Sequence, residues 1–326
     1  MRFCNIHADS SGEDLNDRSD FHVSEITDQR RWTELLLGFD YPHPMQTWQW
    51  GEARALLGGG VSRWSVMKNE NCVLLAQCFT RRMKGVPLQL AWVPRGPVYS
   101  DTRETDGALA ALVRVLRACA FRILVVQPYS PHSPSALLRK VPFREREFTF
   151  VVNLPTLSDK VGRLLRTKGI NRFEREGGAI VERTGEDAVD TLVRQYAQLA
   201  ERKEFRQYGG EQLIRNIWNA YNRSDDPRLS AQIFHAEVGS QTASSCMVLR
   251  VNRTAHFMWA AADYEMRKVR SGEAMQWHLM QTLRSKGVEL YDLEGADRKR
   301  NPGVYEFKAK LGGVLVERAP AGFKVL

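Results

Sequence analysis

The chain has 326 residues, of which 43% are hydrophobic and 26% are charged, and its formal net charge is +9. This balance is ordinary for a globular protein and does not favour disorder, and a length about twice that of a typical ~150-residue domain predicts two domains. No apolar run approaches the ~18 residues that cross a bilayer, and the polar N-terminus lacks the apolar core of a secretion signal. We therefore expect a cytoplasmic protein without a transmembrane segment, with residues 1–20 as a loose tail.

The cysteines and the net charge indicate which kinds of site and which kinds of binding partner to expect. The five cysteines are scattered and form no C-x-x-C pair, which predicts small buried hydrophobes rather than disulfides or a zinc site. The positive charge predicts an anionic partner, namely a nucleic acid, a nucleotide-sugar or a membrane surface, with simple solubility as the alternative. Basic residues cluster at 160–175, 202–206, 267–270 and 298–310, which favours a binding surface.

The first half alternates between helix and strand patterns. Apolar residues at helical spacing predict three helices, at 29–37, 48–57 and 107–120. Alternating or short apolar runs predict four strands, at 62–67, 71–80, 88–93 and 123–126.

The second half repeats these patterns. Helices are predicted at 156–175, 187–201, 211–221 and 272–286. Strands are predicted at 179–182, 229–238, 242–251, 254–261 and 290–293, the middle three joined by tight hairpin turns. The order predicts an α/β (α+β) fold with two domains, 21–147 and 148–313, each a mixed, mostly antiparallel sheet flanked by helices, with a linker over 142–147.

Six segments carry, in order, the motifs of a known family. They are 46–54 (QTWQWGEAR), 92–98 (WVPRGPV), 168–178 around Asn171-Arg172, 200–205 (AERKEF), 291–295 (YDLEG), and 303–308 (GVYEFK) followed by Gly312-Gly313. With these motifs the chain resembles the Fem-type (FemABX) peptidyltransferase-like aminoacyltransferases. The resemblance implies two acetyltransferase-like (GNAT-like) domains, with a last strand at 314–318 that returns to the first domain, so that 314–326 would belong to it. It also implies transfer of an amino acid from aminoacyl-tRNA to an amine, usually on a peptidoglycan precursor.

The chain departs from the family pattern at a few places. Residues 259–262 read WAAA where the family commonly has YGAS, Arg54 replaces a lysine, and Leu311 replaces a phenylalanine. About fifty residues separate Ile180 from Leu229, too few for the coiled-coil arm of some members, so we expect no arm. This short form resembles members that act on soluble nucleotide-linked precursors.

The implied reaction is attack of a neutral amine on a reactive ester, so we expect no metal and no cofactor, with aminoacyl-tRNA as co-substrate. Lys308, in the F-K motif, is the candidate for stabilising the oxyanion, and Phe307 for packing the terminal adenine or the aminoacyl group. Asp292 is a candidate proton acceptor or a cap of the strand end. No Ser-His-Asp or Cys-His pattern is visible, which disfavours covalent catalysis.

Other residues are candidates for substrate binding, each with a solvated or structural side chain as the alternative. For a diphosphate and the acceptor cleft, the candidates are Arg54, Trp92, Arg202, Arg206, Tyr208, Trp259 and Tyr305. For tRNA phosphates, the candidates are Lys168, Arg172, Arg175, Arg267 and Arg270. The expected acceptor is anionic, such as a UDP-linked muropeptide or a lipid-linked precursor, the latter implying peripheral proximity to a membrane.

The strongest competing reading is an N-acyltransferase that uses acyl-CoA. Such enzymes hold pyrophosphate on an (R/Q)-x-x-G-x-(G/A) loop that opens a helix, and residues 269–274 (VRSGEA) come close to that pattern. Aminoacyl transfer to a peptidyl natural product is a further alternative. A non-catalytic binding module is a third reading, which the presence of Lys308 disfavours.

Overall fold

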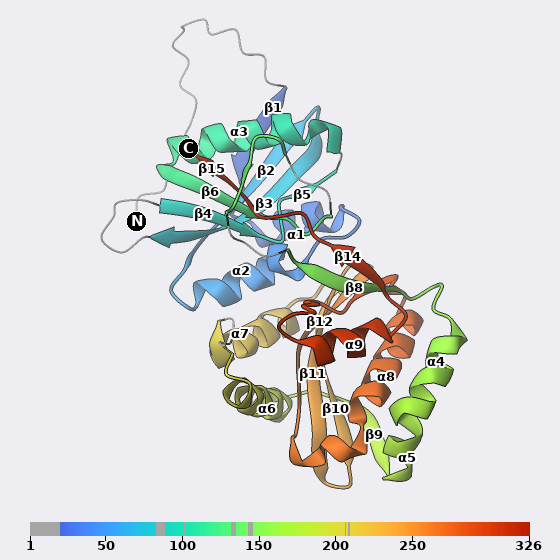
Figure 1. Cartoon of the computed structure of the whole chain (residues 1–326). Helices are drawn as coiled ribbons and strands as arrows, with labels where there is room; N and C mark the ends of the chain where they lie inside the picture. The colour runs from blue at the N-terminus through green and yellow to red at the C-terminus, as the bar shows by residue number, and fades with distance from the viewer. Residues whose placement is uncertain are drawn as a thin grey trace, which may run out of the picture.

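The computed structural model describes residues 20–82, 89–100, 102–131, 135–142, 146–205, 207 and 209–326, without the side chains of residues 82, 102 and 168. All of the predicted tail at 1–20 except residue 20, and part of the linker at 142–147, therefore lie outside the described residues. Two mixed sheets, each flanked by helices, lie one above the other in Figure 1. This confirms the predicted fold class.

The first sheet contains eight strands. Its order is β1 (Phe21–Glu25), β2 (Gly60–Lys68), β3 (Asn71–Arg82), β4 (Gln89–Pro94), β6 (Phe121–Gln127), β15 (Gly322–Val325) and β7 (Arg139–Lys140), with β5 (Val98–Tyr99) paired to β3. Among the described strands of this sheet, only β4 and β6 pair in parallel, and α3 (Thr105–Ala118) connects them. Along β3, Leu74, Ala76 and Cys78 pack toward α3, whereas Leu75 packs against α1 (Gln29–Leu37) on the other face. The period-2 alternation of β3 thus lets one strand serve two helical layers.

The second sheet repeats this arrangement with seven strands. Its order is β14 (Val314–Glu317), β8 (Phe148–Asn153), β13 (Leu290–Asp292), β12 (Thr254–Ala262), β11 (Gln241–Val251), β10 (Leu229–Val238) and β9 (Gly178–Arg183). The parallel pair is β12 and β13, connected by α8 (Ser271–Ser285). On β11, Cys246 and Val248 face the core that contains α8, whereas Met247 and Leu249 face the core formed with α6 (Glu186–Arg202) and α7 (Gly210–Asn222).

Helices cover both faces of the second sheet (Figure 1). On the α8 side, α4 (Asp159–Leu165), the π-helical turn η3 (Arg166–Ile170) and α5 (Asn171–Arg175) replace the single helix predicted at 156–175. Gly169 in this turn lies so close to Glu273 of α8 that a Cβ would come within 2.8 Å of its carboxylate. The extra residue of the π turn therefore coincides with close packing between helices. None of the described helices has the length and hydropathy that crossing a bilayer requires.

The predicted return strand at 314–318 is wrong. Val314–Glu317 forms β14, which extends the second sheet by pairing with β8. The chain crosses back only afterwards, and β15 pairs with β6 and β7 of the first sheet. A Cβ added to Gly313 would lie only 3.1 Å from the main-chain oxygen of Val151, so the chain already runs close beside β8 where the crossing was expected.

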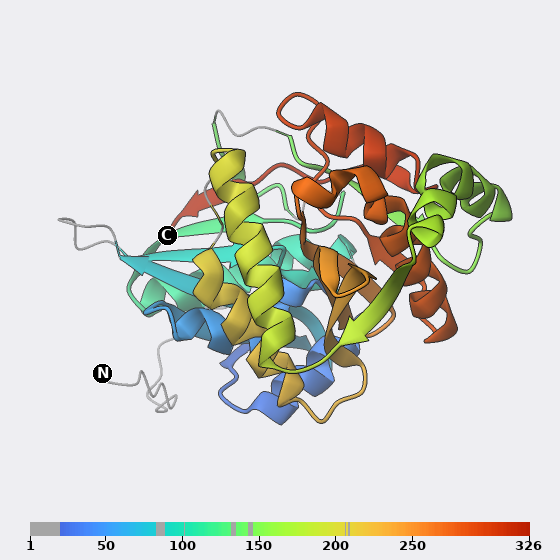
Figure 2. The ribbon, with the colours of Figure 1, turned by 90° about the horizontal axis from the view of Figure 1, so that it is seen from below.

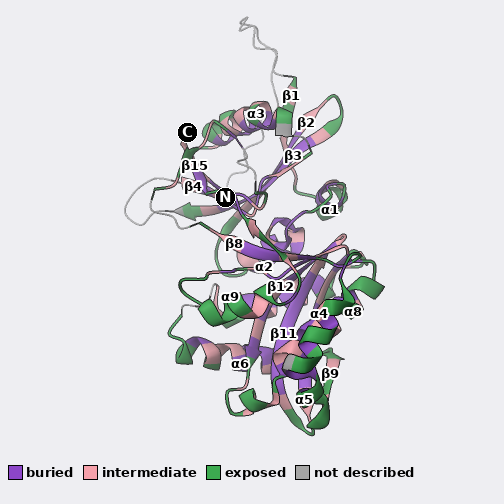
Figure 3. Cartoon of the chain, turned by 45° about the vertical axis from the view of Figure 1, so that its right-hand side comes forward, coloured by how far each residue is buried: buried purple, intermediate pink, exposed green. Residues whose placement is uncertain are grey.

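An apolar block joins the two halves. Helix α2 (Trp48–Ala55) of the first half packs on α7 of the second, and the ring of Trp50 stacks on that of Trp259, with centroids 5.9 Å apart. Hydrogen bonds join Thr47 to Tyr221, at 3.0 Å between hydroxyl oxygens, and Asn216 to the carbonyl of Ala53, at 3.2 Å. Figure 2 shows α6 and α7 lying beneath the first half, and Figure 3 shows the buried strands enclosed by helices with exposed outer faces.

Candidate active site

The parallel strands β12 and β13 separate at the centre of the second sheet. Their pairing ends at His256 and Asp292, after which β12 continues to Ala262 while the chain leaves β13 through Glu294 and Gly295. A cavity of about 810 Å³ and another of about 510 Å³ lie beside this point. The smaller one is lined by the end of β12, the first residues of α8, the C-terminal part of α6, Glu294 and Gly295, and α9 (Pro302–Ala309).

Lys308 and Phe307 of α9 line the smaller cavity. The Lys308 ammonium donates to the main-chain carbonyls of Glu294 and of Gly295, the latter at 2.8 Å. The YDLEG and GVYEFK motifs of the sequence therefore meet at this contact. An ammonium carries three N–H donors, so one remains for a substrate oxygen. Burial lowers the pKa of Lys308 to about 8, and the carboxylates of Glu294 and Asp292 oppose that effect.

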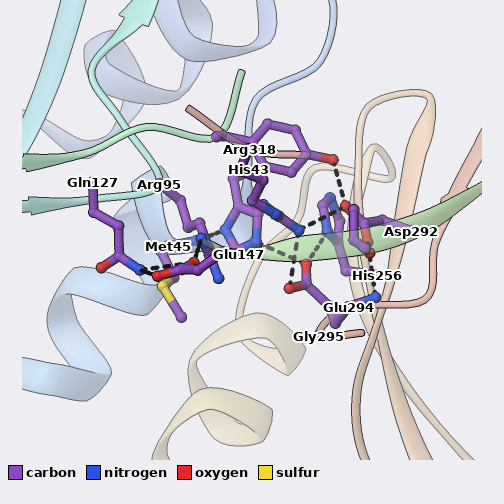
Figure 4. Close-up of polar contacts among 12 residues, drawn as sticks. His43, Met45, Arg95, Gln127, Glu147, His256, Asp292, Glu294, Gly295 and Arg318 are labelled. Carbon is purple, nitrogen blue, oxygen red and sulfur yellow. Dashed lines mark hydrogen bonds and ion pairs between the residues drawn. The ribbon is translucent and has the colours of Figure 1, made fainter. Parts of the chain in front are cut away.

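Asp292 is fully buried behind Glu294 (Figure 4). One of its carboxylate oxygens accepts hydrogen bonds from Tyr129, at 2.9 Å, and from the Arg318 guanidinium, at 3.0 Å. The other accepts from the Thr149 hydroxyl and from the amide of Glu294, the latter at 2.8 Å. Four donors therefore surround this carboxylate, which matches a structural anchor and leaves little room for the proposed role as proton acceptor.

Glu294 joins both halves of the molecule (Figure 4). Its Oε1 lies 2.9 Å from Nε2 of His43, in the first half, and 2.9 Å from Nδ1 of His256 on β12, and its Oε2 lies 3.3 Å from Arg318. Burial alone would raise the pKa of Glu294, but Arg318 and the two histidines outweigh it and hold the pKa well below its ordinary range. Burial also keeps the pKa of His43 well below its ordinary value, so the ring is neutral and donates from Nε2.

The same three residues offer a possible metal-ligand set, because their donor atoms lie within 4.8 Å of one another. Two imidazoles and a carboxylate suit several transition metals. Here both ring nitrogens already meet one oxygen of Glu294, and a guanidinium contacts the other oxygen. A metal on Nδ1 of His256 would also leave its Nε2–H buried, where no partner exists among the described residues. The arrangement favours a hydrogen-bonded ion pair over a metal site.

The larger cavity lies on the other side of this network. Its lining includes His43, Tyr129, Asp292 and Arg318 of the network, together with apolar side chains of α1, β5, β8 and β14. Glu294 lines only the smaller cavity among the two. The buried polar network is thus a wall between the two cavities.

The structure brings some of the predicted cationic residues to the smaller cavity. Arg202, at the end of α6, lines it and lies over the ring of Tyr264 at 4.4 Å. Arg267 covers the same ring at 4.0 Å, and Arg270 immediately precedes α8. Arg172 and Arg175 are exposed on α5, away from the cavity lining. The predicted positions Arg206 and Tyr208, and the side chain of Lys168, lie outside the described part of the structure.

The remaining predicted substrate residues contribute to packing. Trp259 is 5% exposed and stacks on Trp50, so the expectation that it lines an acceptor cleft is wrong. Trp92 packs on Phe79 and beneath Arg81, at the edge of the same apolar block. The guanidinium carbon of Arg54 lies 5.9 Å from the centroid of the Phe79 ring, and the ring of Tyr305 packs edge-on against that of Phe150. Neither cavity is lined by any of these four residues.

Sequence reasoning missed the polar wall. Glu294 falls within the YDLEG motif, but His43, Tyr129, His256 and Arg318 carry no pattern that a single sequence reveals. His43 and Glu294, whose side chains lie 2.9 Å apart, are separated by 251 residues in the chain. Only the fold brings them together.

Comparisons with known proteins agree with this architecture. Residues 165–309 match the acetyltransferase (GNAT) domain. No curated protein matches the chain significantly. Among solved structures, FemX is similar over 94% of this chain and 97% of its own, with 14% identity and a TM-score of 0.76.

Two further structures show the same fold at greater distance. The C-terminal domain of a putative lysylphosphatidylglycerol synthetase from Agrobacterium fabrum has 14% identity and a TM-score of 0.55, with 90% of each chain covered. A tandem GNAT protein from the clavulanic acid biosynthesis pathway has 13% identity and a TM-score of 0.55, covering 94% of this chain and 98% of its own. The chain therefore has the Fem-type fold of two acetyltransferase-like (GNAT-like) domains.

Proposed function

We propose that the protein transfers an aminoacyl group from aminoacyl-tRNA to the amine of a peptidyl acceptor, such as a peptidoglycan precursor, in the cytoplasm. The observation that carries the proposal is Lys308, which faces a cavity at the start of α8 and donates two of its three N–H groups within the described part of the chain. The likeness to FemX, and to a protein named for lysylphosphatidylglycerol, an aminoacyl product, supports this choice.

For this reaction the protein has to position the two substrates and to stabilise the negative charge that develops on the ester carbonyl oxygen. The neutral acceptor amine attacks the ester carbonyl carbon, and negative charge develops on the carbonyl oxygen. The Lys308 ammonium stabilises that oxyanion, an effect typically worth ~3–4 kcal/mol. The ester C–O bond then breaks, the ribose oxygen of the tRNA leaves and takes up a proton, and the new amide nitrogen loses one. Phe307, beside Lys308 in the cavity, packs the aminoacyl group or the terminal adenine.

Positive charge around the cavity supports a tRNA donor. Arg202 lines the cavity, and Arg267 and Arg270 lie on the segment that leads into α8. Ser271 and Gly272 at the start of that helix also line it, where main-chain amides favour an anion. Arg172 and Arg175 add exposed positive charge on α5, which follows the turn η3 that packs on α8. Several phosphates of the tRNA acceptor end would contact this surface.

The deciding experiment is mass spectrometry of products formed from charged total tRNA and candidate acceptors, among them a UDP-linked muropeptide. We expect an acceptor heavier by one aminoacyl residue, and we expect Lys308→Ala to lower turnover by about 100-fold or more. Lys310→Ala, two residues further on and exposed, is the matched control. Wild-type turnover in folded K308A would contradict the role of Lys308, and no product with any acceptor would contradict the activity.

A second candidate is an N-acyltransferase that uses acyl-CoA. The start of α8 at the cavity is the observation in its favour, because it could hold a pyrophosphate as readily as a tRNA phosphate. Thermal-shift titrations with acetyl-CoA and with the UDP-linked muropeptide separate the two. Saturable stabilisation by acetyl-CoA, with acetylated product and without aminoacyl transfer, would favour the second candidate.

A further inference from the structure

Lys308 is held by main-chain carbonyls in an uncommon backbone conformation. Its two acceptors belong to Glu294 and Gly295, whose φ angles are +51° and +25°. A non-glycine residue with positive φ carries a conformational cost of order 1–3 kcal/mol and persists only where its surroundings fix it. The position of Lys308 therefore depends on whatever fixes Glu294.

The side chain of Glu294 is fixed by three donors from three parts of the fold. His43 directly precedes the short helix η1 (Pro44–Gln46) of the first half, His256 lies on β12, and Arg318 lies on the segment between β14 and β15. All three side chains are at most 3% exposed. The ring of His43 is itself oriented, because the amide of Met45 donates to its Nδ1 at 3.0 Å.

None of these three donors lines the cavity that Lys308 faces. Among the described residues that line the Lys308 cavity, Glu294 is present, whereas His43, His256 and Arg318 are not. Within the Lys308 cavity, the contact of each of the three is therefore made through Glu294. Its contact with His43 also spans the boundary between the two halves, so it forms only when the halves are docked.

Glu294 also acts on Lys308 through its charge. The carboxylate raises the pKa of the ammonium against the effect of burial, and Asp292 acts in the same direction. The positive charges nearby are Arg318, paired to both carboxylates, and Arg202, across the cavity. Glu294 is thus the anion on which both the position and the ionisation of Lys308 depend.

We propose that Glu294 is the positioning residue for Lys308, and that His43 makes this positioning depend on docking of the first domain. Lys308 is held in place at the cavity only while the first domain holds Glu294. The inference rests on the proposed function for its catalytic meaning, but its geometry can be tested without any transfer assay.

The test is the ionisation of Lys308, measured by competitive acetylation of lysines across pH, with peptide mass spectrometry to quantify each site. Glu294→Gln keeps the shape and removes the charge, so Lys308 should titrate about one pH unit lower than in the wild type. His43→Ala keeps the charge of Glu294 but frees its backbone, so Lys308 becomes more exposed and should titrate higher. Glu289→Gln, on an exposed pair with Arg253 just before β13, is the matched control and should change nothing.

Opposite shifts in the two variants support the proposal, because a residue with only a general structural role would not move the titration in both directions. Unchanged titration of Lys308 in either folded variant overturns it. Circular dichroism verifies that each variant folds. If Glu294→Gln fails to fold, the comparison of His43→Ala with His43→Gln decides. A glutamine at position 43 can still donate a hydrogen bond to Glu294, so His43→Gln should restore the wild-type titration of Lys308. If the variants show these shifts but the wild-type protein transfers no aminoacyl group, the proposed function is contradicted and the positioning role of Glu294 still holds.

Discussion

Arg318 is the only described cation that contacts both carboxylates of the polar wall, those of Asp292 and Glu294, so its removal tests how much this wall contributes to stability. The side chain is 3% exposed and lies 3.0 Å from Asp292 and 3.3 Å from Glu294. Arg318→Met keeps most of the volume and removes the charge. Breaking a buried ion pair from one side typically costs about 3–5 kcal/mol, because the remaining charge is left uncompensated. With two carboxylates released, we expect the upper part of that range.

The pH dependence gives the sign of the effect. In the wild type the pKa of Glu294 is held low, so its contribution to stability is present above the ordinary value near 4.5 and is lost as pH falls through the lowered pKa. In Arg318→Met the effect of burial is less opposed and the pKa of Glu294 rises. Protonation of Glu294 at lower pH then removes the uncompensated charge in the variant. The loss of stability should therefore be largest near neutral pH and smaller toward about pH 4.

Urea unfolding followed by circular dichroism, at several pH values, measures this difference. Arg146→Met is the matched control, because Arg146 pairs with Glu317 on the surface with its side chain 75% exposed. Such exposed pairs are worth about 0–1 kcal/mol. A loss below about 1 kcal/mol in Arg318→Met at pH 7, or a loss that grows toward acid, would refute the reasoning.

Three further outcomes follow from the structure. Gly96→Ala should lower the free energy of unfolding by about 1–3 kcal/mol in urea titrations, since its Cβ would come within 2.6 Å of the buried Gln46 side chain; a neutral substitution would show that Gln46 can move. Turnover measured across pH should rise as the acceptor amine deprotonates and fall above pH about 8, where Lys308 loses its proton; a plateau to pH 10 would argue against an ammonium. Filter binding of tRNA should weaken linearly in log[salt], and Arg172→Ala and Arg175→Ala should each reduce the slope by about one; unchanged slopes would place the tRNA elsewhere.

Most of the fold could be read from periodicity, because most strands bury two faces in a regular way. Helix α1 has the predicted bounds 29–37, and the three-stranded meander β10 to β12 is where its alternating runs placed it. Strand β8 was missed, although Phe148–Asn153 is an apolar run, because the preceding charged segment was read as a linker. Its place between β13 and β14 depends on pairings far along the chain, which local patterns do not encode.

The site residues, like the fold, could be predicted only where a local sequence motif indicates them. Motif resemblance led to Lys308 and Phe307, which the structure places together in a cavity. It misassigned Trp259, because an aromatic side chain gives the same sequence signal in a core as in a cleft. It was silent on His43 and Glu294, since one isolated histidine and one glutamate become informative only when the fold brings them to 2.9 Å.

The position of β15 has a consequence for how the protein is made. This strand follows the second sheet in the sequence, yet it lies between β6 and β7 of the first sheet. Ribosomal synthesis proceeds from the N-terminus, and domains generally fold as they emerge. Here the first sheet cannot be completed until the second domain and β15 have been translated, and the edge of β6 stays unpaired until then. Its maturation is therefore completed last, and an unfinished chain would expose a strand edge open to association.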